Sequence, residues 1–364
     1  RDHDTLARLG GDEFALVLAP GDEVAASTAG LRLRSALEQS FQVEDIVVHI
    51  DASVGIALFP DHAPDPIGLL QRADVAMYEA KRMRTGHEVY LRSRDRHSRE
   101  RLALIGELPA AIDARQLVLH YQPKADLSSG AVRGVEALVR WEHPLRGLLT
   151  PGHFLPLAEQ SGLTRALTAF VLDRALSEIA ALGVQPELTV AVNLGPADLL
   201  DFGLPQEVAR ALERRGFPPE RLILEVSEDV IVADPDRTLD VLERLRALGV
   251  GLALDDFGAG QSSLAHLKSL RLDELKIDRS FVIGMTATTV DAAIVRSTVD
   301  LAHRLGLRVT AEGAATHEAW DLLTACGCDE AQGDLLARPM PAGELSAWLG
   351  RGAAGGRPRP TTSA

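Results

Sequence analysis

Residues 250–256 read Val-Gly-Leu-Ala-Leu-Asp-Asp, a short apolar run that ends in two adjacent carboxylates. The next segment, 257–263, reads Phe-Gly-Ala-Gly-Gln-Ser-Ser, and its two glycines allow it to bend sharply. A short apolar run bounded by turn residues is typical of a buried strand. The stretch therefore predicts a strand that carries two acidic side chains to its end, then a mobile loop and a helix over 264–270 that the serines can cap.

The same pattern, an apolar run that ends in a polar residue and precedes a helix-like stretch, repeats from Leu104 to about Gly350. The polar residues at the ends of the predicted strands are Glu136, Asn193, Glu225, Asp255 with Asp256, Lys276, Glu312 and Gln332. Alternating strands and helices predict an α/β fold with a parallel sheet. Seven or eight such units in about 245 residues predict a closed TIM-type β/α barrel whose site lies where the strands end. An open doubly wound sheet is the alternative, although no G-x-G-x-x-G follows a first strand.

Acidic side chains at several strand ends would meet at one mouth of such a barrel. A single acidic residue after a strand is usually a helix cap, but a crowd of carboxylates repels itself unless cations lie among them. Carboxylate and amide oxygens, without cysteine or paired histidine, favour Mg²⁺ or Mn²⁺ over zinc. Because Asp256 stands beside Asp255, there are enough carboxylates for two ions, an arrangement that suits displacement at phosphorus.

Lys276 is one of only four lysines in a chain that otherwise uses arginine. A lysine at a strand end in the same mouth could orient an attacking water, accept its proton or stabilise a phosphate. The alternative is a structural ion pair with a neighbouring carboxylate.

The first ninety residues predict a smaller unit of a different kind. Gly10-Gly11 between two apolar runs indicates a hairpin. Helical patterns cover residues 24–40 and 69–83, and a strand pattern covers 46–59.

The 364 residues suffice for two domains, or for one large barrel with a fragment. The charged segment 92–101 reads as a solvated linker, and the Gly-, Pro- and Ser/Thr-rich end of the chain as a disordered tail. The predicted divisions are a partial domain over 1–90, a polar linker over 91–103, the barrel over 104–349 and the tail over 350–364.

The composition limits which partners the protein is expected to bind and where in the cell it is expected to lie. The net charge of −14 argues against nonspecific binding to nucleic-acid polymers or to anionic membranes. No apolar run reaches the roughly 18 residues of a membrane-spanning helix. Two cysteines, Cys326 and Cys328, are too few for a disulfide framework. We therefore expect a cytoplasmic location, with any membrane anchor lying upstream of Arg1.

The strand-end motifs resemble those of the EAL-domain family, phosphodiesterases that linearise cyclic di-GMP to 5′-pGpG. The resemblance begins at Glu136-Ala-Leu138 with Val139-Arg140-Trp141, and its order and spacing hold over about 245 residues, as in a whole barrel of this class. The further matching motifs are Val192-Asn193-Leu194, Leu224-Glu225-Val-Ser-Glu228, Asp255-Asp256-Phe257-Gly258, Leu275-Lys276-Ile277-Asp278, Ala311-Glu312-Gly313 and Gln332-Gly333.

This resemblance implies a role for each matching residue. The implied metal ligands are Glu136, Asn193, Glu225, Asp255, Asp256 and Glu312, holding two Mg²⁺ or Mn²⁺ ions. Lys276 would act as a base or orient water, Gln332 would contact a metal-bound water, and Glu312 counts with them as catalytic. Gln122, Arg140 and Asp278 would bind the dinucleotide, and Glu228 would anchor the loop that follows Asp255. A homodimer through the barrel is the expected assembly. The chain departs from the family pattern at Ala259, Ala315 and Asp334, and the last two bear on the rate of turnover.

The N-terminal part resembles GGDEF-type diguanylate cyclases. The resemblance rests on the hairpin Arg8-Leu-Gly10-Gly11-Asp12-Glu13-Phe14 and on the segments 52–57 and 73–81. Arg1 and Asp4 stand where such domains carry an inhibitory product-binding site. Only the C-terminal half of that family is matched, so a complete cyclase site is not expected in this chain.

Three functions compete on this reading. The leading one is a metal-dependent phosphodiesterase that hydrolyses cyclic di-GMP in bacterial signalling. The second is a receptor that binds cyclic di-GMP with little or no hydrolysis. Such a receptor would be expected to lack one or more of the acidic ligands or Lys276, and all of them are present. The third, a cyclase, is disfavoured by the missing half-domain.

Overall fold

The computed structural model divides the chain into two compact units, Arg1–Leu104 and Ile105–Ala364, which we describe separately. The structure describes residues 4–10, 13–18, 22–37, 41–43, 46–48, 52–83, 85–91, 103–112, 114, 116–183, 187–227, 234–258 and 270–352.

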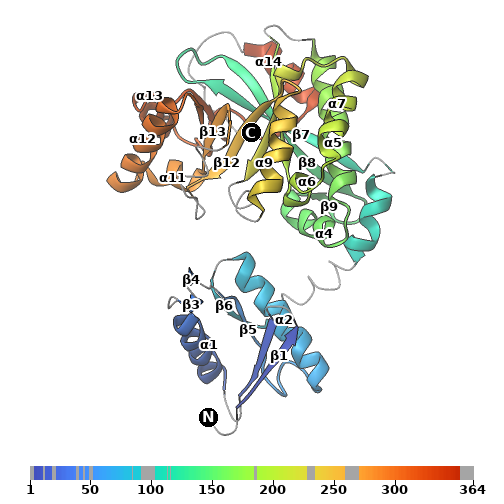
Figure 1. Ribbon diagram of the computed structural model, residues 1–364, viewed down its shortest axis with the longest axis vertical. Helices are drawn as coiled ribbons and strands as arrows, with labels where there is room; N and C mark the ends of the chain where they lie inside the picture. The colour runs from blue at the N-terminus through green and yellow to red at the C-terminus, as the bar shows by residue number, and fades with distance from the viewer. Residues whose placement is uncertain are drawn as a thin grey trace. The chain divides into compact units, whose positions relative to one another are not determined.

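Among its described residues, the first unit holds short strands and the helices α1 and α2 (Figure 1). Its elements are β1 (Thr5–Gly10), β2 (Glu13–Val17), α1 (Glu23–Leu37), β3 (Phe41–Val43), β4 (Ile46–Val48), β5 (Val54–Ile56), α2 (Pro66–Arg82) and β6 (His87–Val89). Asp65 caps α2 by accepting a hydrogen bond from the Gly68 amide, which explains why that helix begins earlier than expected. The described strands form three separate pairs, β1–β2, β3–β4 and β5–β6.

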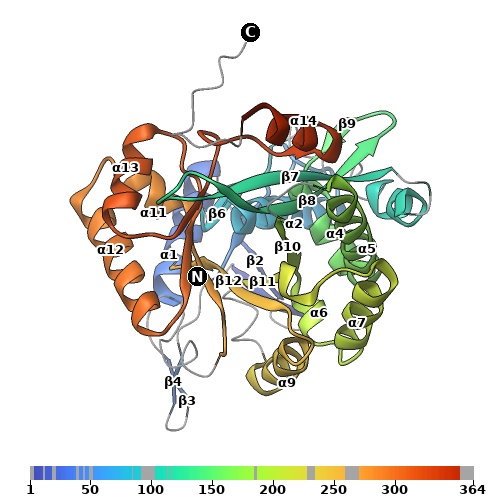
Figure 2. The ribbon, with the colours of Figure 1, turned by 90° about the horizontal axis from the view of Figure 1, so that it is seen from above.

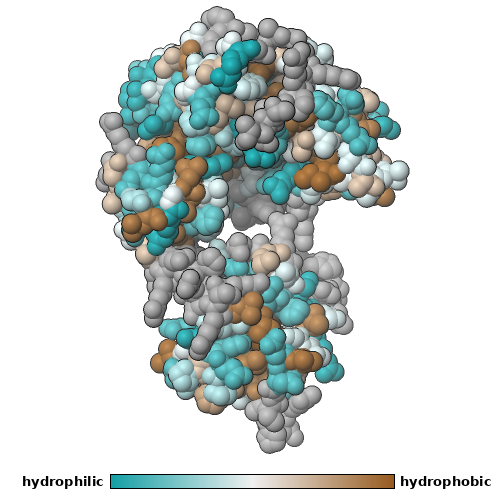
Figure 3. Space-filling model, turned by 180° about the vertical axis from the view of Figure 1, so that it is seen from behind, coloured by the Kyte–Doolittle hydropathy of each residue, from teal (hydrophilic) through white to brown (hydrophobic). Residues whose placement is uncertain are grey.

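The single strand predicted over 46–59 is wrong. β4 pairs antiparallel with β3, whereas β5 pairs in parallel with β6, so the two segments join different partners. The hairpin β1–β2 exposes Leu6, Phe14 and Val17, each by at least 60%. Figure 3 shows hydrophobic residues at the surface of the molecule in small groups among hydrophilic ones. Because its pairs are small and its apolar side chains lie in water, this unit has little core of its own.

The second unit is a closed barrel, as predicted. Its strands follow one another in the order β7, β8, β10, β11, β12, β13, β14 and β15, and β7 pairs with β8 to close the ring. Their bounds are β7 (Leu117–Asp126), β8 (Val132–His143), β10 (Thr189–Leu194), β11 (Leu222–Ser227), β12 (Gly251–Phe257), β13 (Glu274–Ile277), β14 (Arg308–Ala311) and β15 (Glu330–Gln332). Two short strands, β9 (Gly147–Leu149) and β16 (Met340–Pro341), extend the sheet beyond β8 and β7.

One strand departs from the parallel sheet that the repeating pattern predicts. β7 runs antiparallel to both of its neighbours, β8 and β15. A short turn over residues 127–131 joins β7 to β8, and a connection of that length allows only an antiparallel pair. β7 therefore reaches the mouth of the barrel with its N-terminal half.

Helices cover the outside of the strands, as Figure 2 shows. They are α4 (Leu155–Gln160), α5 (Thr164–Leu182), α6 (Pro196–Leu199), α7 (Leu204–Arg215), α9 (Pro235–Arg246), α11 (Arg279–Gly284), α12 (Thr289–Arg304), α13 (His317–Ala325) and α14 (Ala342–Gly352), with 3₁₀ turns at Pro151–His153 and Pro219–Arg221. Side chains of Asp234, Thr288 and Thr316 cap α9, α12 and α13, since each accepts from a backbone amide of the first turn. The central strands are buried on both faces, as a sheet enclosed by helices requires.

The predicted boundaries differ slightly from the observed elements. Residues 103–112 form a helix, and α14 continues to Gly352 into the segment predicted as a tail. Most of the predicted linker, 92–102, and residues 353–364 lie outside the described residues. No helix in the described part of the chain is both long enough and apolar enough to span a bilayer.

Candidate active site

The barrel strands bring the predicted site residues to one mouth. Glu136 lies on β8, Asn193 on β10, Glu225 on β11, Asp255 and Asp256 on β12, Lys276 on β13 and Gln332 on β15, while Glu312 directly follows β14. Most of them therefore lie within the last three residues of their strands rather than beyond them. Glu136 is the exception, because β8 continues through the apolar residues after it to His143.

Lys276 lies at the floor of the site among four carboxylates. Its Nζ atom is 2.6 Å from Glu312 Oε1, 2.7 Å from Glu225 Oε2 and 3.1 Å from Asp255 Oδ1. Glu136 Oε2 is the fourth partner, at 3.7 Å. The ammonium group is fully buried, so each of these attractions acts with little screening by water.

Three amide side chains, on β7, β10 and β15, line the site around Glu136 of β8. Asn193 Nδ2 donates to Glu136 Oε1 at 2.7 Å, and Gln332 Nε2 donates to Glu136 Oε2 at 2.6 Å. Gln332 Nε2 also donates to Gln122 Oε1 at 3.0 Å, and Gln122 donates in turn to the Ala337 carbonyl. Gln332 Oε1 is buried and has no hydrogen-bond partner in the described structure, so it is free to accept a bond from a ligand.

A second group of acidic residues lies nearer the rim. Oxygen atoms of Asp255, Asp256 and Glu312 all lie within 4.8 Å of one another. Asp256 adopts a positive φ of 55°, which is uncommon for residues other than glycine. This backbone conformation interrupts the regular alternation of side chains along the strand. The site thus runs from the buried Glu225 and Lys276 to the exposed Asp256.

Burial and neighbouring charges change the pKa values of the acidic groups in the site. Burial raises the pKa of Glu312 to about 8, with Asp255 and Glu136 acting in the same direction against Lys276. Burial and then the charge of Asp255 raise the pKa of Asp256 to about 6. Although burial opposes it, the charges of Lys124 and Lys276 lower the pKa of Glu225 to about 2.

These residues fit a divalent cation. Their donors are carboxylate and amide oxygens, which Mg²⁺ and Mn²⁺ prefer. Burial and the charge of Asp255 raise the pKa values of Glu312 and Asp256 despite the opposing charge of Lys276, and a cation beside these carboxylates would lower both. Gln332 Oε1, which has no hydrogen-bond partner among the described residues, is a further acceptor.

The residues predicted to bind substrate lie in different settings. Arg140 is half-buried on β8, four positions beyond Glu136 on the same face, and its guanidinium donates to the Val139 carbonyl at 2.9 Å. Gln122 lies against Gln332, as described above. Asp278 caps α11, since its Oδ1 accepts from the Ser280 amide at 2.9 Å and from the Ser280 hydroxyl. Asp278 also acts on the pKa of Asp256 in the site, and substrate binding by Asp278 stays a prediction.

Several predicted site residues cannot be placed. Glu228, Arg1, Gly11, Asp12, the loop residues 259–263 and the helix predicted over 264–270 lie outside the described residues. Asp4 directly precedes β1, Gly10 ends that strand, and Glu13 and Phe14 begin β2. The Arg8 guanidinium lies over the Phe14 ring, 5.8 Å from its centre.

Two charged side chains inside the barrel were not predicted from the sequence. Lys124 of β7 and Glu274 of β13 are each about 1% exposed inside the barrel. The signal for Lys124 was its rarity among residue types and its place within a run of buried residues, 117–126. Glu274 stands two positions before Lys276 and so shares its face of the strand.

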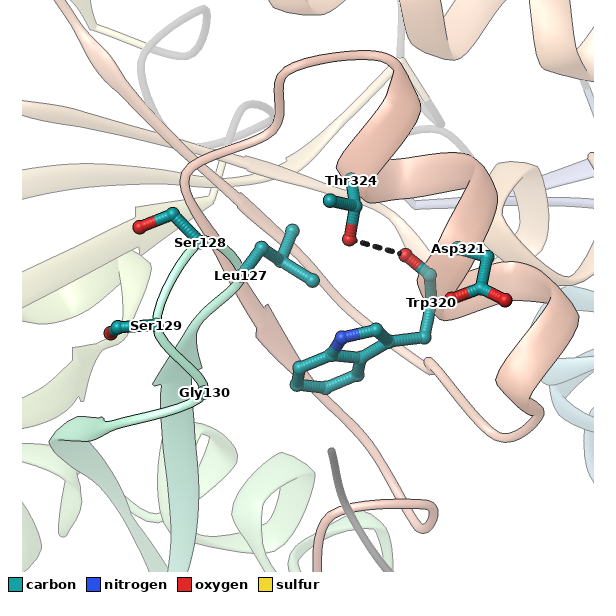
Figure 4. A pocket seen from close by; sticks show the side chains of 7 residues that line it. All are labelled: Leu127, Ser128, Ser129, Gly130, Trp320, Asp321 and Thr324. Atoms are coloured by element: carbon teal, nitrogen blue, oxygen red, sulfur yellow. Dashed lines mark hydrogen bonds between the residues drawn. The ribbon is translucent and has the colours of Figure 1, made fainter. Parts of the chain in front are cut away.

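A separate cavity of about 220 Å³ lies at the opposite end of the barrel. It is lined by the turn residues Leu127, Ser128, Ser129 and Gly130 and by Trp320, Asp321 and Thr324 of α13. Figure 4 shows the Trp320 side chain extending from the helix toward the turn. None of the predicted site residues lines this cavity.

Fold and site together define a β/α barrel protein with an acidic mouth. The chain belongs to the EAL domain family, which it matches over residues 105–339. Residues 1–87 match the GGDEF domain of diguanylate cyclases.

Two curated relatives illustrate the likeness along the chain. The bifunctional diguanylate cyclase/cyclic di-GMP phosphodiesterase MucR of Pseudomonas aeruginosa is 44% identical over 350 residues, which cover 95% of this chain and 51% of that protein. The cyclic di-GMP phosphodiesterase PdeR of Escherichia coli is 36% identical over 355 residues, covering 96% of this chain and 53% of that protein. The chain thus spans about half the length of the curated relatives it matches.

Solved structures agree with this assignment. The PaMucR phosphodiesterase in complex with c-di-GMP is 46% identical, with a TM-score of 0.64, and the match covers 67% of this chain and 99% of that one. The EAL enzyme Bd1971, with cAMP and cyclic di-GMP bound, is 26% identical with a TM-score of 0.67, and the match covers 79% of this chain and 77% of that one.

Proposed function

We propose that the barrel hydrolyses one phosphodiester bond of cyclic di-GMP to give 5′-pGpG in bacterial second-messenger signalling. The observation that carries this proposal is the convergence of five carboxylates at one barrel mouth, four of them within 4 Å of the Lys276 ammonium. Membership of the EAL domain family and the 46% identity to PaMucR phosphodiesterase, solved with c-di-GMP, supply the substrate class.

Six residues would hold two Mg²⁺ or Mn²⁺ ions: Glu136, Asn193, Glu225, Asp255, Asp256 and Glu312. Such ions lower the pKa of a bound water and stabilise negative charge on a phosphate. Asp255 and Asp256 are adjacent on β12, so one strand end would serve both ions. Glu136 is held by two amide donors, which fixes its orientation before any ligand binds.

The remaining residues would orient water and substrate. Lys276 would hold the attacking water in line and stabilise charge on the phosphate, because its ammonium is fixed by Glu225 and Glu312. Gln332 would accept a hydrogen bond from that water through Oε1. Gln122 and Arg140 would contact the dinucleotide, and Glu228 would anchor the loop after Asp255. Homodimerisation through the barrel and a cytoplasmic location stay predictions.

A turnover assay separates an enzyme from a receptor. The chain, incubated with cyclic di-GMP and Mg²⁺ or Mn²⁺, is expected to yield pGpG, resolved by anion-exchange or reversed-phase chromatography. A matched variant, Glu136→Gln, should lose turnover, because a neutral amide is a poorer metal ligand than a carboxylate. Binding of cyclic di-GMP without any pGpG would refute the enzyme and leave the receptor.

A further inference from the structure

Lys124 connects the site to the charged interior of the barrel. Its ammonium is fully buried and lies 2.8 Å from Glu225 Oε1. Glu274 Oε1 is its second carboxylate partner, at 3.5 Å. Burying an ammonium group is unfavourable unless it is paired, so this position needs both carboxylates or a functional reason.

The two oxygens of Glu225 are divided between two lysines. Oε1 accepts from Lys124 at 2.8 Å, and Oε2 accepts from Lys276 at 2.7 Å. Since Lys124 approaches from the interior of the barrel and Lys276 from the site, the carboxylate group is held at both ends and cannot rotate. Oε2 retains a second lone pair on the site's side, whereas Oε1 is directed away from it.

Glu274 is itself fixed, which makes Lys124 a rigid support. Glu274 Oε1 accepts from the Thr310 hydroxyl at 2.7 Å, and its Oε2 lies 3.4 Å from the Arg308 guanidinium. Charges therefore alternate from Lys276 through Glu225, Lys124 and Glu274 to Arg308 at the far end of the barrel.

We propose that Lys124 is a positioning residue that makes Glu225 a one-oxygen ligand, and thereby favours Mg²⁺ and Mn²⁺ over Ca²⁺. The inference rests on the proposed function, in which Glu225 binds a metal ion. Mg²⁺ demands compact octahedral coordination, whereas Ca²⁺ accepts more oxygens and often takes both oxygens of one carboxylate. Both oxygens of Glu225 accept from a buried ammonium, but Lys276 belongs to the site and Lys124 holds Oε1 toward the interior, so Glu225 can offer a metal ion only Oε2.

A simpler role for Lys124 is neutralising Glu274, and the two roles predict different results. If neutralisation were its only task, replacing both residues by uncharged ones would restore wild-type metal preference. If Lys124 positions Glu225, the double replacement would still free Oε1 and allow two-oxygen ligation.

The test compares Ca²⁺ with Mn²⁺ by isothermal titration calorimetry on the whole chain, without substrate. Because both ions carry the same charge, the ratio of their dissociation constants cancels the general electrostatic effect of removing an ammonium. The variants are Lys124→Met, the double variant Lys124→Met with Glu274→Gln, and Glu274→Gln alone. Tryptophan fluorescence in urea checks folding, since all three tryptophans lie in the barrel unit.

In Lys124→Met and in the double variant, the affinity for Ca²⁺ relative to Mn²⁺ should rise by about tenfold. That is the scale typical of losing a residue that orients a metal ligand. Glu274→Gln, which keeps Lys124, should retain the wild-type ratio. If Lys124→Met fails to fold, the charge-balanced double variant decides the matter. A wild-type ratio in the double variant would overturn the proposal, whereas absence of any divalent binding by the wild type would refute the metal site itself.

Discussion

Lys276 Nζ lies 2.6 Å from Glu312 Oε1, and this contact joins the buried floor of the site to its rim. The two residues end or follow the neighbouring parallel strands β13 and β14, so the contact depends on the register of that pair. One ammonium group thereby fixes a carboxylate that also belongs to the acidic group with Asp255 and Asp256. Loss of Lys276 should consequently change chemistry more than substrate binding.

We predict that Lys276→Ala lowers kcat for cyclic di-GMP by about 10²-fold or more, as expected for loss of a positioned proton-transfer or charge-stabilising group. The apparent affinity for the dinucleotide should change far less, because metal ions would still hold the phosphate. Steady-state kinetics with and without the substitution measure both effects. Lys81→Ala, on the exposed surface of α2, is the matched control and should leave both values unchanged. A Lys276→Ala protein with wild-type kcat would exclude a catalytic role.

We predict activity with Mg²⁺ or Mn²⁺ and inhibition by Ca²⁺. The donor set is all oxygen, and Ca²⁺ binds at longer distances with a looser geometry, which should misplace the attacking water. Turnover is measured with each ion after dialysis against a chelator, and then with Ca²⁺ added to the Mg²⁺-loaded protein. Full hydrolysis in excess chelator would contradict the proposal of metal dependence.

Most of the barrel could be predicted because a polar residue lies near the end of most of its strands. The apolar runs before Asn193, Glu225 and Asp255 identify strands, and one mouth collects their ends. The reversed direction of β7 was missed because an apolar pattern identifies a strand but not its partner. The turn residues Ser128, Ser129 and Gly130, which favour a hairpin, were the available signal.

The sequence predicts which residues form the site, but it does not predict the contacts that reach the site from the barrel interior. Sequence order places Glu225 and Lys276 at strand ends, yet it does not show that Lys124 reaches Glu225 from another strand across the interior. Such a contact depends on barrel closure and strand stagger, which no local pattern encodes. Asp278 adds a second case, since its motif predicts substrate binding but gives no sign of the helix cap that the structure shows.

We predict that this chain makes no cyclic di-GMP from GTP. Only the C-terminal half of the GGDEF pattern was matched by its motifs, and phosphoryl transfer needs both sides of its metal clamp. Residues 1–90 should also be digested by protease before the barrel, because their strands form small separate pairs with exposed apolar side chains. Synthesis of cyclic di-GMP would overturn the first statement, and equal protease resistance of both units the second.

We predict that Glu228→Ala leaves the barrel folded but weakens metal binding. Glu228 stands three residues after Glu225 in the sequence, too far along to share its metal easily, and we infer that it anchors the glycine-containing loop after Asp255. Raising Mg²⁺ should then recover part of the lost turnover. A folded variant that stays inactive at every Mg²⁺ concentration would indicate a direct chemical role, and a fully active one would remove the anchoring role.

The last prediction concerns the close approach of two backbone segments beside Glu312 and Gln332. A Cβ atom added at Gly333 would lie 2.2 Å from the Ala314 carbonyl oxygen and 2.5 Å from its amide nitrogen. The same segments are joined by hydrogen bonds from the Ala314 amide to the Gln332 carbonyl and from the Leu335 amide to the Ala314 carbonyl. Backbone atoms cannot rotate away as a side chain can, so the strand ends that carry Glu312 and Gln332 would separate.

Gly333→Ala should therefore lower the free energy of unfolding of the barrel by about 2 kcal/mol, within the usual range for overpacking, and should weaken Mn²⁺ binding. Urea denaturation followed by tryptophan fluorescence measures the first effect, and calorimetry the second. Gly343→Ala in α14 is the matched control, because no described atom beyond its chain neighbours and its own helix backbone lies within 4 Å of its added Cβ. That control should bind Mn²⁺ normally and change stability by less than about 1 kcal/mol. If Gly333→Ala behaved like Gly343→Ala, the close packing of these two segments would have no bearing on the site.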